Sequence, residues 1–366
     1  MEKVLVISCA QDFKFSKNAS YLLENHLDDV KAGAEKYAAT IGASSILYFL
    51  ENGSKDYGLE NVAFGMNSPT NSNAYSIVQQ LKGDLPRPMI QDDFVATLDG
   101  KEYAVLTIGA AFALVKPEIR VFTVASDDST EVKEVPVGTK LSDVICTENA
   151  KAVLIGGQQG KFILPQAASE IVLDNSFLFN FVYIVPKSAC MVALMSSFMS
   201  HCWEKSCGKC VLCREGSLQS KVILEDLALG KAKSTDIELL KDITPLIKAG
   251  AYCPFGQTWP ETLKTGIELF SAEFEAHAKK KCLADVCFKA GSLYAILPDK
   301  CTGCTDCIDE CNYTAIEGKK GFIHMIDQDM CEHCGECVDK CPEEAIVMVE
   351  GKLPKLPKKL TRVGKF

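Results

Sequence analysis

The side chains best suited to bind metal in this chain are its cysteines, of which there are eighteen among 366 residues. Eight of them form the run C-x2-C-x2-C-x3-C twice, thirty residues apart. Three thiolates on a tight loop can hold three corners of an iron-sulfur cube, while the fourth cysteine, on the following helix, reaches the other cube. We therefore expect two 4Fe-4S clusters. Their ligand sets are Cys301, Cys304, Cys307 and Cys341, and Cys331, Cys334, Cys337 and Cys311.

The alternative for this repeat, two structural zinc ions, requires only pairs of cysteines and does not explain eight in a duplicated pattern. The repeat resembles the two-cluster bacterial ferredoxins. Asn312 stands where the first unit of that pattern usually has proline. This difference removes no ligand, but we expect it to alter the packing around the second cluster.

A third group of cysteines lies upstream, in a C-x2-C-x2-C loop followed forty positions later by one more cysteine. Three sulfurs on one loop and one distant sulfur again satisfy a cube, and Gly208 permits a close approach of the backbone. By spacing alone, a zinc site remains a rival interpretation. The proposed ligands of this third 4Fe-4S cluster are Cys207, Cys210, Cys213 and Cys253.

Six cysteines remain, and two of them form the run H-x4-C-x4-C with His277. A set of three cysteines and one histidine suits a closed, tetrahedral structural zinc. Buried free thiols are the equally weighted alternative, because they are common and inert. Cys202 is the second choice for the fourth ligand, and we expect Cys9 and Cys146 in the core. The candidate zinc ligands are Cys190, His277, Cys282 and Cys287.

Composition and charge narrow the class of protein. Hydrophobic residues make up 47% and charged residues 24%, as in globular proteins. The net charge of −9 argues against binding to nucleic acid. We see no secretory signal and no membrane-spanning segment, so we expect a cytoplasmic protein, where thiols stay reduced and bind metal more often than they form disulfides.

The last sixteen residues, 351–366, contain six basic residues and no acidic one. Removing these six charges from the net charge of −9 leaves −15 for the rest of the chain. Two interpretations stay open for this tail. It is a solvated, partly disordered segment, or it docks to an acidic partner.

Apolar periodicity predicts the elements that position these cysteines. Strand runs at 4–7 and 45–50 with a helix at 74–81 indicate an α/β region. A hairpin, a short helix and a returning strand between 120 and 155 suggest a β-grasp-like module. Helical spacing follows from about residue 188, and the cysteine repeat comes last. The fold class is therefore multidomain, with α/β, β-grasp, helical and ferredoxin-like α+β parts.

The segment Ser206–Gly216, with Cys253-Pro254-Phe255-Gly256, resembles the cluster-binding helical domain of the NADH-binding flavoprotein subunit of respiratory complex I. The same domain occurs in electron-bifurcating hydrogenases and formate dehydrogenases. Residues 151–163 are similar to the SLBB β-grasp domain of that family, and hydrogenase-type relatives append a ferredoxin pair. The resemblance implies these domains: 1–115 flavoprotein-like α/β, 116–168 SLBB, 169–290 helical 4Fe-4S, 291–350 two-cluster ferredoxin and 351–366 basic tail.

Two motifs of that family are missing. The glycine-rich G-R-G-G-A-G-F-P loop, which cradles the flavin phosphate, has no counterpart. Where the later G-E-E stretch would fall, residues 67–75 contain neither glycine nor paired acids. A phosphate cradle needs consecutive free N-H groups in unusual dihedrals, which glycine provides and Pro69 cannot. We therefore expect FMN and NAD to be absent and residues 1–115 to be a degenerate scaffold.

The resemblance implies an iron-sulfur electron-transfer subunit of a multisubunit oxidoreductase, in an anaerobic or low-oxygen cell. Its three clusters would relay electrons between another subunit and a partner flavoprotein or soluble ferredoxin. No residue needs to act as acid, base or nucleophile. The first alternative is an NADH-dependent flavoprotein subunit with a modified FMN and NADH site. The second is a zinc-organised assembly adaptor.

Overall fold

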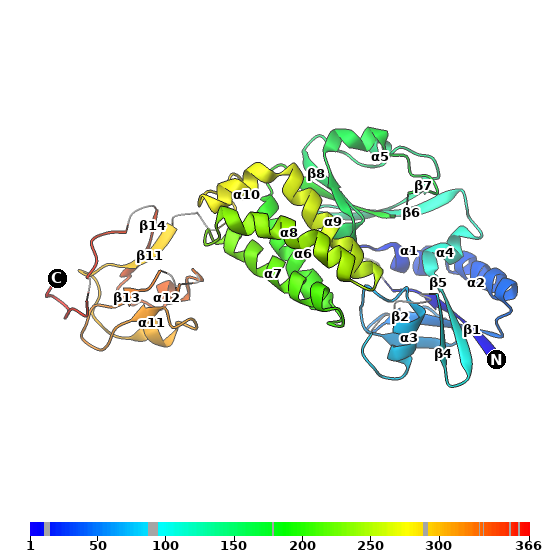
Figure 1. Cartoon of the computed structure of the whole chain (residues 1–366), viewed down its shortest axis with the longest axis horizontal. Coiled ribbons are helices and arrows are strands. Elements are labelled where there is room, and N and C mark those ends of the chain that lie inside the picture. The colour runs from blue at the N-terminus through cyan, green and yellow to red at the C-terminus, as the bar shows by residue number, and fades with distance from the viewer. Residues whose placement is uncertain are drawn as a thin grey trace. The chain divides into compact units, whose positions relative to one another are not determined.

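The computed structural model describes two compact units (Figure 1). One unit comprises Met1–Ile223 with Ile237–Ser271, and the other comprises Leu224–Asp236 with Ala272–Phe366. The expected domain boundary at 290/291 falls outside the described residues. The described residues are 1–10, 15–86, 94–177, 179–287, 292–328, 330–331, 333–350, 353–357 and 359–366.

The first unit begins with a five-stranded mixed sheet in the order β3-β2-β1-β5-β4. The four strands β3, β2, β1 and β5 run parallel, and β4 pairs antiparallel with β5 at the edge. The helices α1, α2, α3 and α4 lie between its strands in the chain or directly after them. The bounds are β1 Glu2–Ser8, α1 Asn18–Asn25, α2 Leu27–Ile41, β2 Ser45–Glu51, β3 Val62–Gly65, α3 Ala74–Leu81, β4 Val95–Leu98, β5 Lys101–Thr107 and α4 Ile108–Ala113.

Both faces of this sheet are covered, which explains why β1 reads as a continuous apolar run. Leu5 and Ile7 pack with residues of α1, α2 and α4. Val6 faces the other way and packs with Ile77 and Val78 of α3. The α/β region predicted from residues 1–115 is therefore confirmed as a parallel-strand core with helices on both sides.

A second mixed sheet follows in the order β7-β6-β10-β8-β9. The predicted hairpin is β6 and β7, which pair antiparallel from Ile119 to Pro136. The short elements α5 and η2 supply residues that pack on the core of this sheet. The bounds are β6 Ile119–Ala125, β7 Thr130–Pro136, α5 Leu141–Val144, β8 Ala150–Ile155, η1 Gly157–Gln159, β9 Lys161–Ile163, η2 Pro165–Glu170 and β10 Phe181–Pro186.

The central strand β10 lies beyond residue 168, the predicted end of this domain. It is parallel to β6 and antiparallel to β8, so it completes the sheet. Phe181, Val182 and Val185 are almost wholly buried. A strand buried on both faces gives an apolar run without alternation, and spacing alone does not distinguish it from a buried helix.

Helices make up the next part of the chain, where the sequence predicted them. Glycine or proline marks several of their ends, with Pro254 at the first position of α9 and Gly250 at the end of α8. Their bounds are α6 Met191–Lys205, α7 Val211–Ala228, α8 Ser234–Gly250, α9 Pro254–Leu269 and α10 Ser271–Ala278. No helix in the described part of the chain has both the length and the apolar character needed to cross a membrane.

The second unit contains the cysteine repeat, built on two small sheets. Strand β11 pairs antiparallel with β14, and β12 pairs antiparallel with β13. A single turn of helix includes the third cysteine of each repeat, as expected for ferredoxin-like units. The bounds are β11 Ser292–Ile296, α11 Asp306–Asp309, β12 Ile316–Glu317, β13 Met325–Ile326, α12 Glu336–Asp339 and β14 Ile346–Glu350.

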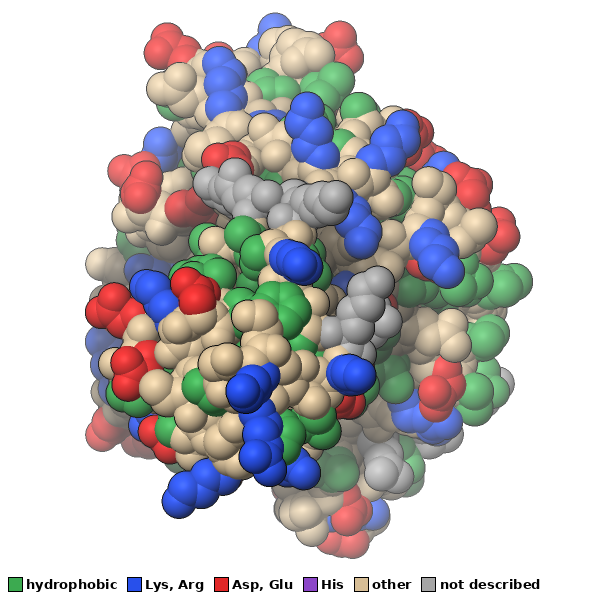
Figure 2. All heavy atoms as spheres, turned by 90° about the vertical axis from the view of Figure 1, so that its left-hand side faces the viewer, with side chains coloured by type: hydrophobic (Ala, Val, Ile, Leu, Met, Phe, Trp, Pro, Cys, Tyr) green, Lys and Arg blue, Asp and Glu red, His purple; other side chains and the backbone are tan. Residues whose placement is uncertain are grey.

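The described part of the basic tail is attached to this second unit. Phe322 and Arg362 form an isolated antiparallel bridge. The Ile323 N-H donates to the Thr361 carbonyl at 2.8 Å. Figure 2 faces this unit and shows Lys and Arg side chains gathered on the surface nearest the viewer. Residues 353–357 and 359–366 therefore belong to the folded surface, whereas Lys352 and Lys358 lie outside the described residues.

The contact between α2 and α4 gives a test of this fold. A Cβ added at Gly33 of α2 would lie 1.9 Å from the Ala111 carbonyl oxygen of α4. We expect Gly33→Ala to lower the free energy of unfolding by about 1–3 kcal/mol, the usual cost of overpacking. Gly109→Ala in α4 is the control, because a Cβ there meets no atom within 4 Å. Equal effects of the two substitutions on urea unfolding would contradict the described contact.

Candidate metal centres

The four cysteines of the upstream set line one small cavity in the first unit. Cys207 and Cys210 precede α7, whereas Cys213 lies in its first turn. Cys253 is the N-cap residue of α9. Gly208 has φ of 73°, a left-handed conformation that few other residues adopt easily. The turn between Cys207 and Cys210 therefore uses the backbone freedom predicted for this glycine.

Polar groups around this cavity suit sulfur ligands. The Tyr252 N-H donates to Cys210 Sγ at 3.3 Å, and Ser206 Oγ lies 3.8 Å from Cys213 Sγ. The buried indole nitrogen of Trp259 has no hydrogen-bond partner among the described residues. This nitrogen lies near Cys213 and opposes the rise of that thiol's pKa, although it makes no hydrogen bond of ordinary geometry with a described residue. An unsatisfied buried donor beside a cysteine is what a site for a sulfur-rich anionic group provides.

Burial favours the protonated form of two sulfurs in this cavity, those of Cys213 and Cys253, while no metal is bound. The pKa of Cys253 is raised to about 11, mainly by burial, with smaller contributions from the neighbouring Cys207 and Cys213. Burial is also the main cause of the raised pKa of Cys213, and neighbouring cysteines add to it. Four thiolates do not share one buried cavity unless cations balance their charge, so metal binding must release their protons. The donor set therefore fits a cationic metal centre.

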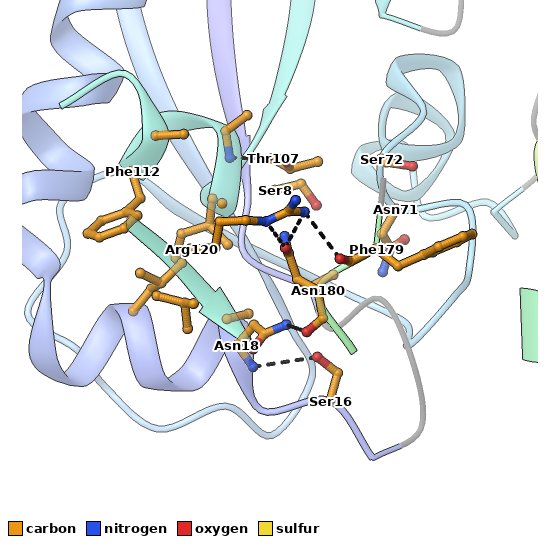
Figure 3. Close-up of a pocket in the computed structure, with 18 of the residues that line it drawn as sticks. Ser8, Ser16, Asn18, Asn71, Ser72, Thr107, Phe112, Arg120, Phe179 and Asn180 are labelled. Atoms are coloured by element: carbon orange, nitrogen blue, oxygen red, sulfur yellow. Dashed lines mark hydrogen bonds between the residues drawn. The ribbon is translucent and has the colours of Figure 1, made fainter. Parts of the chain in front are cut away.

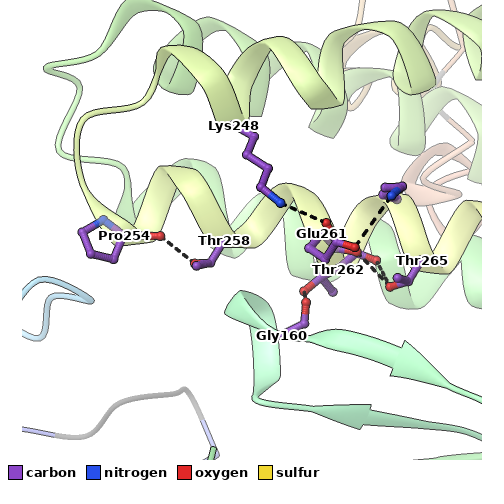
Figure 4. Close-up of polar contacts among 8 residues, drawn as sticks. Gly160, Lys248, Pro254, Thr258, Glu261, Thr262 and Thr265 are labelled. Atoms are coloured by element: carbon purple, nitrogen blue, oxygen red, sulfur yellow. Dashed lines mark hydrogen bonds and ion pairs between the residues drawn. The ribbon is translucent and has the colours of Figure 1, made fainter. Parts of the chain in front are cut away.

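Helix α9, which carries Cys253 at its start, is fixed to the second sheet by hydroxyl groups (Figure 4). Thr262 Oγ1 donates to the Gly160 carbonyl at 2.8 Å, and Thr265 Oγ1 accepts from the Phe162 N-H at 2.9 Å. A Cβ at Gly160 would lie 1.5 Å from the Ile155 carbonyl oxygen. The glycine cluster at 156–160 thus allows the tight turn that meets α9.

In the second unit, one small cavity is lined by all four members of a predicted ligand set, Cys311, Cys331, Cys334 and Cys337. The pKa of Cys337 is raised to about 11, mainly by burial, with smaller contributions from Cys331, Cys334 and Cys311. The structure therefore brings together the three cysteines of one repeat and the last cysteine of the other.

The second predicted set in this unit is also close together. The pKa of Cys307 is raised to about 12, mainly by burial, with smaller contributions from Cys304, Cys301, Cys337 of the other set, and Cys341. Cys301 and Cys307 belong to the buried core of the unit, against which Cys341 packs. This set is the more buried of the two, since Cys334 in the other set is exposed.

The two repeats share an unusual backbone. Thr305 and Gly335 occupy equivalent positions and have φ of 88° and 82°. The N-H groups of Ala315 and Ala345 donate to the sulfurs of Cys311 and Cys341 at 3.4 and 3.3 Å. A positive φ is costly for a β-branched residue such as Thr305 and is found mostly at functional sites.

Two side chains distinguish the repeats. His324 is buried, its Nδ1 lies 3.7 Å from Cys301 Sγ, and burial lowers its pKa. Its Nε2 has no hydrogen-bond partner among the described residues. The sequence predicts no role for His324, because a single histidine carries no spacing signal. Asn312, noted as a departure from the ferredoxin pattern, donates to Glu336 at 3.1 Å and so links the two repeats.

Three of the four candidate zinc ligands come together within the second unit. The ligand atoms of His277, Cys282 and Cys287 lie within 4.8 Å of one another, with His277 Nε2 3.4 Å from Cys287 Sγ. His277 Nδ1 lies 2.8 Å from the Glu273 carbonyl oxygen, which fixes the ring. Such a contact is typical of a metal-bound histidine. The expected fourth ligand, Cys190, is the buried N-cap residue of α6 in the first unit.

The other cysteines divide into buried and exposed thiols. Cys9 is buried in the core of the first sheet, as expected. Cys202, the second choice for a zinc ligand, is wholly buried, and burial raises its pKa. The expectation of a core position for Cys146 was wrong, because this residue is exposed. It closely follows α5, so the adjacent apolar residues Val144 and Ile145 point into the core and the next position faces solvent.

A cavity of about 580 Å³ lies at the carboxyl ends of the parallel strands β1 and β5, next to Ser8 and Thr107 (Figure 3). Ligands of open α/β sheets bind at this edge. Arg120 is the one charged residue among the described residues that line it. Its guanidinium already donates to the carbonyls of Asp174, Phe177 and Phe179 and to Asn180 Oδ1. Cys253 and Phe255 also line this cavity.

Gly256 tests the upstream site. A Cβ there would lie 2.6 Å from the Ala251 Cβ and 3.1 Å from Cys213 Sγ. We expect Gly256→Ala to displace Cys213 and remove about four of about twelve iron atoms from the reconstituted chain. Gly109→Ala again serves as control, because nothing lies within 4 Å of its added Cβ. Full iron content in Gly256→Ala would show that cluster binding does not depend on the close packing of Gly256 against Cys213.

Comparison with known proteins identifies two of these regions. Residues 193–277 match the NADH-ubiquinone oxidoreductase-F iron-sulfur binding region, and residues 300–346 match a 4Fe-4S dicluster domain. The NADP-reducing hydrogenase subunit HndC of Solidesulfovibrio fructosivorans is 34% identical over 204 residues, covering 51% of this chain and 41% of the relative. An NADH-quinone oxidoreductase subunit of Rhizobium meliloti is 28% identical over 165 residues, covering 40% of this chain and 39% of the relative.

The fold is also similar to a solved structure. A chain of an NAD⁺-reducing [NiFe]-hydrogenase in the H₂-reduced state matches 75% of this chain and 56% of its own length, with a TM-score of 0.65 and 19% identity. The matches with the two curated relatives cover less than half of either relative's length. The chain thus combines a segment that matches the NADH-ubiquinone oxidoreductase-F iron-sulfur binding region with a segment that matches a 4Fe-4S dicluster domain.

Proposed function

We propose that this chain is an iron-sulfur electron-transfer subunit of a multisubunit oxidoreductase, which relays electrons through three 4Fe-4S clusters. The observation that carries the proposal is the grouping of the cysteines. Two cavities are each lined by four cysteines of one predicted set. Three members of the third set lie in one core, where Cys341 packs against the buried Cys301 and Cys307. A bound 4Fe-4S cluster accepts and releases one electron, at a potential set by hydrogen bonds to sulfur, local charge and exposure.

The chain's own residues hold and orient the sulfurs. The backbone N-H groups of Tyr252, Ala315 and Ala345 donate to cysteine sulfurs in the three predicted sets. Trp259 and His324 place further ring nitrogens beside Cys213 and Cys301. Donors that face a sulfur favour the reduced, more negative state. These residues would therefore adjust the reduction potentials of the clusters. No side chain is required to transfer a proton.

The domain assignments support a role within a larger assembly. We propose that the first sheet is a degenerate flavoprotein-like scaffold and that the second is an SLBB-type β-grasp domain. The relatives carry the names of a hydrogenase subunit and a quinone oxidoreductase subunit. By this likeness, a partner flavoprotein or ferredoxin would exchange electrons with the chain.

The second candidate function is an NADH-dependent flavoprotein subunit with a modified site. The cavity at the carboxyl ends of β1 and β5 favours it, because a nucleotide would bind at this edge. The polar groups on one wall, however, are already engaged. Asn71 contacts Gln80 and Met66, and Asn73 accepts from Ser76 as the cap of α3. With a single charged residue, Arg120, the described lining offers little to bind phosphate.

Reduction of the purified, cluster-loaded chain separates the two functions. Under anaerobic conditions we expect methyl viologen radical to bleach the cluster absorbance, NADH to leave it unchanged, and no flavin to be released on acid treatment. Cys304→Ala and Cys334→Ala should each lose one cluster and slow electron transfer in the complete complex. Cys146→Ala, at an exposed cysteine, is the matched control.

Two results would contradict the relay. Stoichiometric flavin with rapid reduction by NADH would show that residues 1–115 form a working nucleotide site. Full electron transfer by Cys304→Ala or Cys334→Ala would show that the dicluster domain is not on the electron path.

We also propose a structural zinc held by His277, Cys282 and Cys287, with Cys190 as fourth ligand. Three convergent donors and the carbonyl-fixed ring of His277 support it. A closed set of three sulfurs and one nitrogen leaves no open position, so the metal would stabilise the fold and take no part in chemistry.

Zinc content tests this site directly. We expect about one zinc ion per wild-type chain, its loss in Cys282→Ser, and a lower unfolding temperature in that variant. Cys146→Ser should keep both the zinc and the stability of the wild type. Zinc retained in Cys282→Ser, or no zinc in the wild type, would show that these residues are ordinary thiols.

A further inference from the structure

Basic residues of the tail and of the turn before β13 lie on two paired segments, and the electron-relay function does not explain them. We define the basic surface by six side chains from the tail and from the turn before β13. Phe322 joins the two segments, because Lys319 Nζ and the Arg362 guanidinium lie 4.5 and 5.8 Å from its ring centroid. The members are Lys319, Lys320, Lys355, Lys359, Arg362 and Lys365.

The backbone holds this surface in place. Besides the bridge between Phe322 and Arg362, the Val363 N-H donates to the Gly321 carbonyl at 3.2 Å and the Ile323 N-H donates to Thr361. Lys355 Nζ lies 5.7 Å from the ring centroid of Phe366. The charges therefore sit on a folded surface, and little chain entropy is lost when a partner binds.

Among the described residues, no acidic side chain forms an ion pair with this surface. Segments 318–326 and 353–366 contain no Asp or Glu, although the whole chain has a net charge of −9. Figure 2 shows Lys and Arg side chains together on this face. An acidic protein that exposes this basic surface has a strongly uneven field, which steers charged partners.

The basic surface borders the loop that carries Cys301 and Cys304. Gly303, between these two cysteines, accepts a hydrogen bond from the Gly321 N-H at 3.0 Å. A Cβ at Gly303 would lie 2.8 Å from the backbone of Gly321 and Phe322. Cys304 itself is partly exposed. A molecule that docks on the basic surface is therefore placed beside this ligand set.

We propose that the basic surface docks a small acidic electron-carrier protein that exchanges electrons with the cluster held by Cys301, Cys304, Cys307 and Cys341. This inference rests on the proposed function. It adds the place where electrons enter or leave the chain and the kind of partner that docks there. One electron leaves the reduced carrier and enters that cluster, so the carrier is oxidised and the cluster reduced by one electron. No bond forms or breaks. The reverse transfer uses the same surface.

The test uses the full, cluster-loaded chain and two electron donors of opposite charge. An acidic bacterial two-cluster ferredoxin, reduced beforehand, and methyl viologen radical cation each reduce the chain in an anaerobic stopped-flow instrument. Charge reversal at Lys319→Glu/Arg362→Glu should lower the second-order rate constant with ferredoxin by about tenfold or more at low ionic strength. Added salt should slow the wild type strongly and this variant little.

Two further variants separate charge from folding. Lys320→Glu/Lys365→Glu leaves the contacts of Phe322 intact and should give the same loss with ferredoxin. Lys82→Glu/Lys140→Glu places the same charge change at exposed positions of the first unit and should keep the wild-type rate. Reduction by methyl viologen radical should be equal or faster in every variant, because its charge is positive.

The outcomes distinguish this inference from the function on which it rests. If neither donor reduces the wild-type clusters, the relay itself is wrong. If both donors reduce them, but the ferredoxin rate is independent of salt and equal in all variants, the relay stands and the docking surface is overturned. Salt-sensitive binding to vesicles of anionic phospholipid, with unchanged ferredoxin rates in the variants, would likewise overturn it in favour of a membrane surface.

Discussion

The structure depends on one constraint, which is that sulfur ligands far apart in the sequence must meet in small, largely buried cavities. Thiols that are buried together resist ionisation, as the raised pKa values of Cys253, Cys307 and Cys337 show. A metal centre resolves this conflict, because its cations replace the protons and the free energy of binding is added to that of folding. The cysteine loops already have an unusual backbone that suits metal binding. Thr305, for example, is held at positive φ.

The rest of the molecule positions these loops. In the first unit, the turn at Gly160 and the hydroxyl of Thr262 fix α9, and thereby place Cys253 opposite Cys207, Cys210 and Cys213. In the second unit, the pairing of β11 with β14 and of β12 with β13 supports the cysteine loops. Cys253 and Phe255 line both the large cavity of the first sheet and the small cavity of the upstream cysteines. The scaffold and the cluster region are therefore built as one body within that unit.

Local sequence signals predicted the parts of the structure that depend on local chemistry. The helix at Ala74–Leu81 agrees with its predicted bounds, and the hairpin β6-β7 lies where alternation indicated it. The cysteine sets followed from spacing, because ligand geometry limits the loops that can bind a cluster. Strand β10 was assigned to the helical domain, since a central strand buried on both faces lacks alternation. The contacts of His324 and Trp259 with cysteines depend on tertiary packing, which no local pattern encodes.

The central claim is that the chain holds three cubane clusters. Its most direct test is iron and acid-labile sulfide content, combined with Mössbauer spectroscopy of the anaerobically reconstituted, ⁵⁷Fe-labelled full chain. The account predicts about twelve iron and about twelve sulfide per chain, all in 4Fe-4S spectra. A chain that holds about eight iron, with a second zinc ion in the cavity of Cys207, Cys210, Cys213 and Cys253, would contradict it.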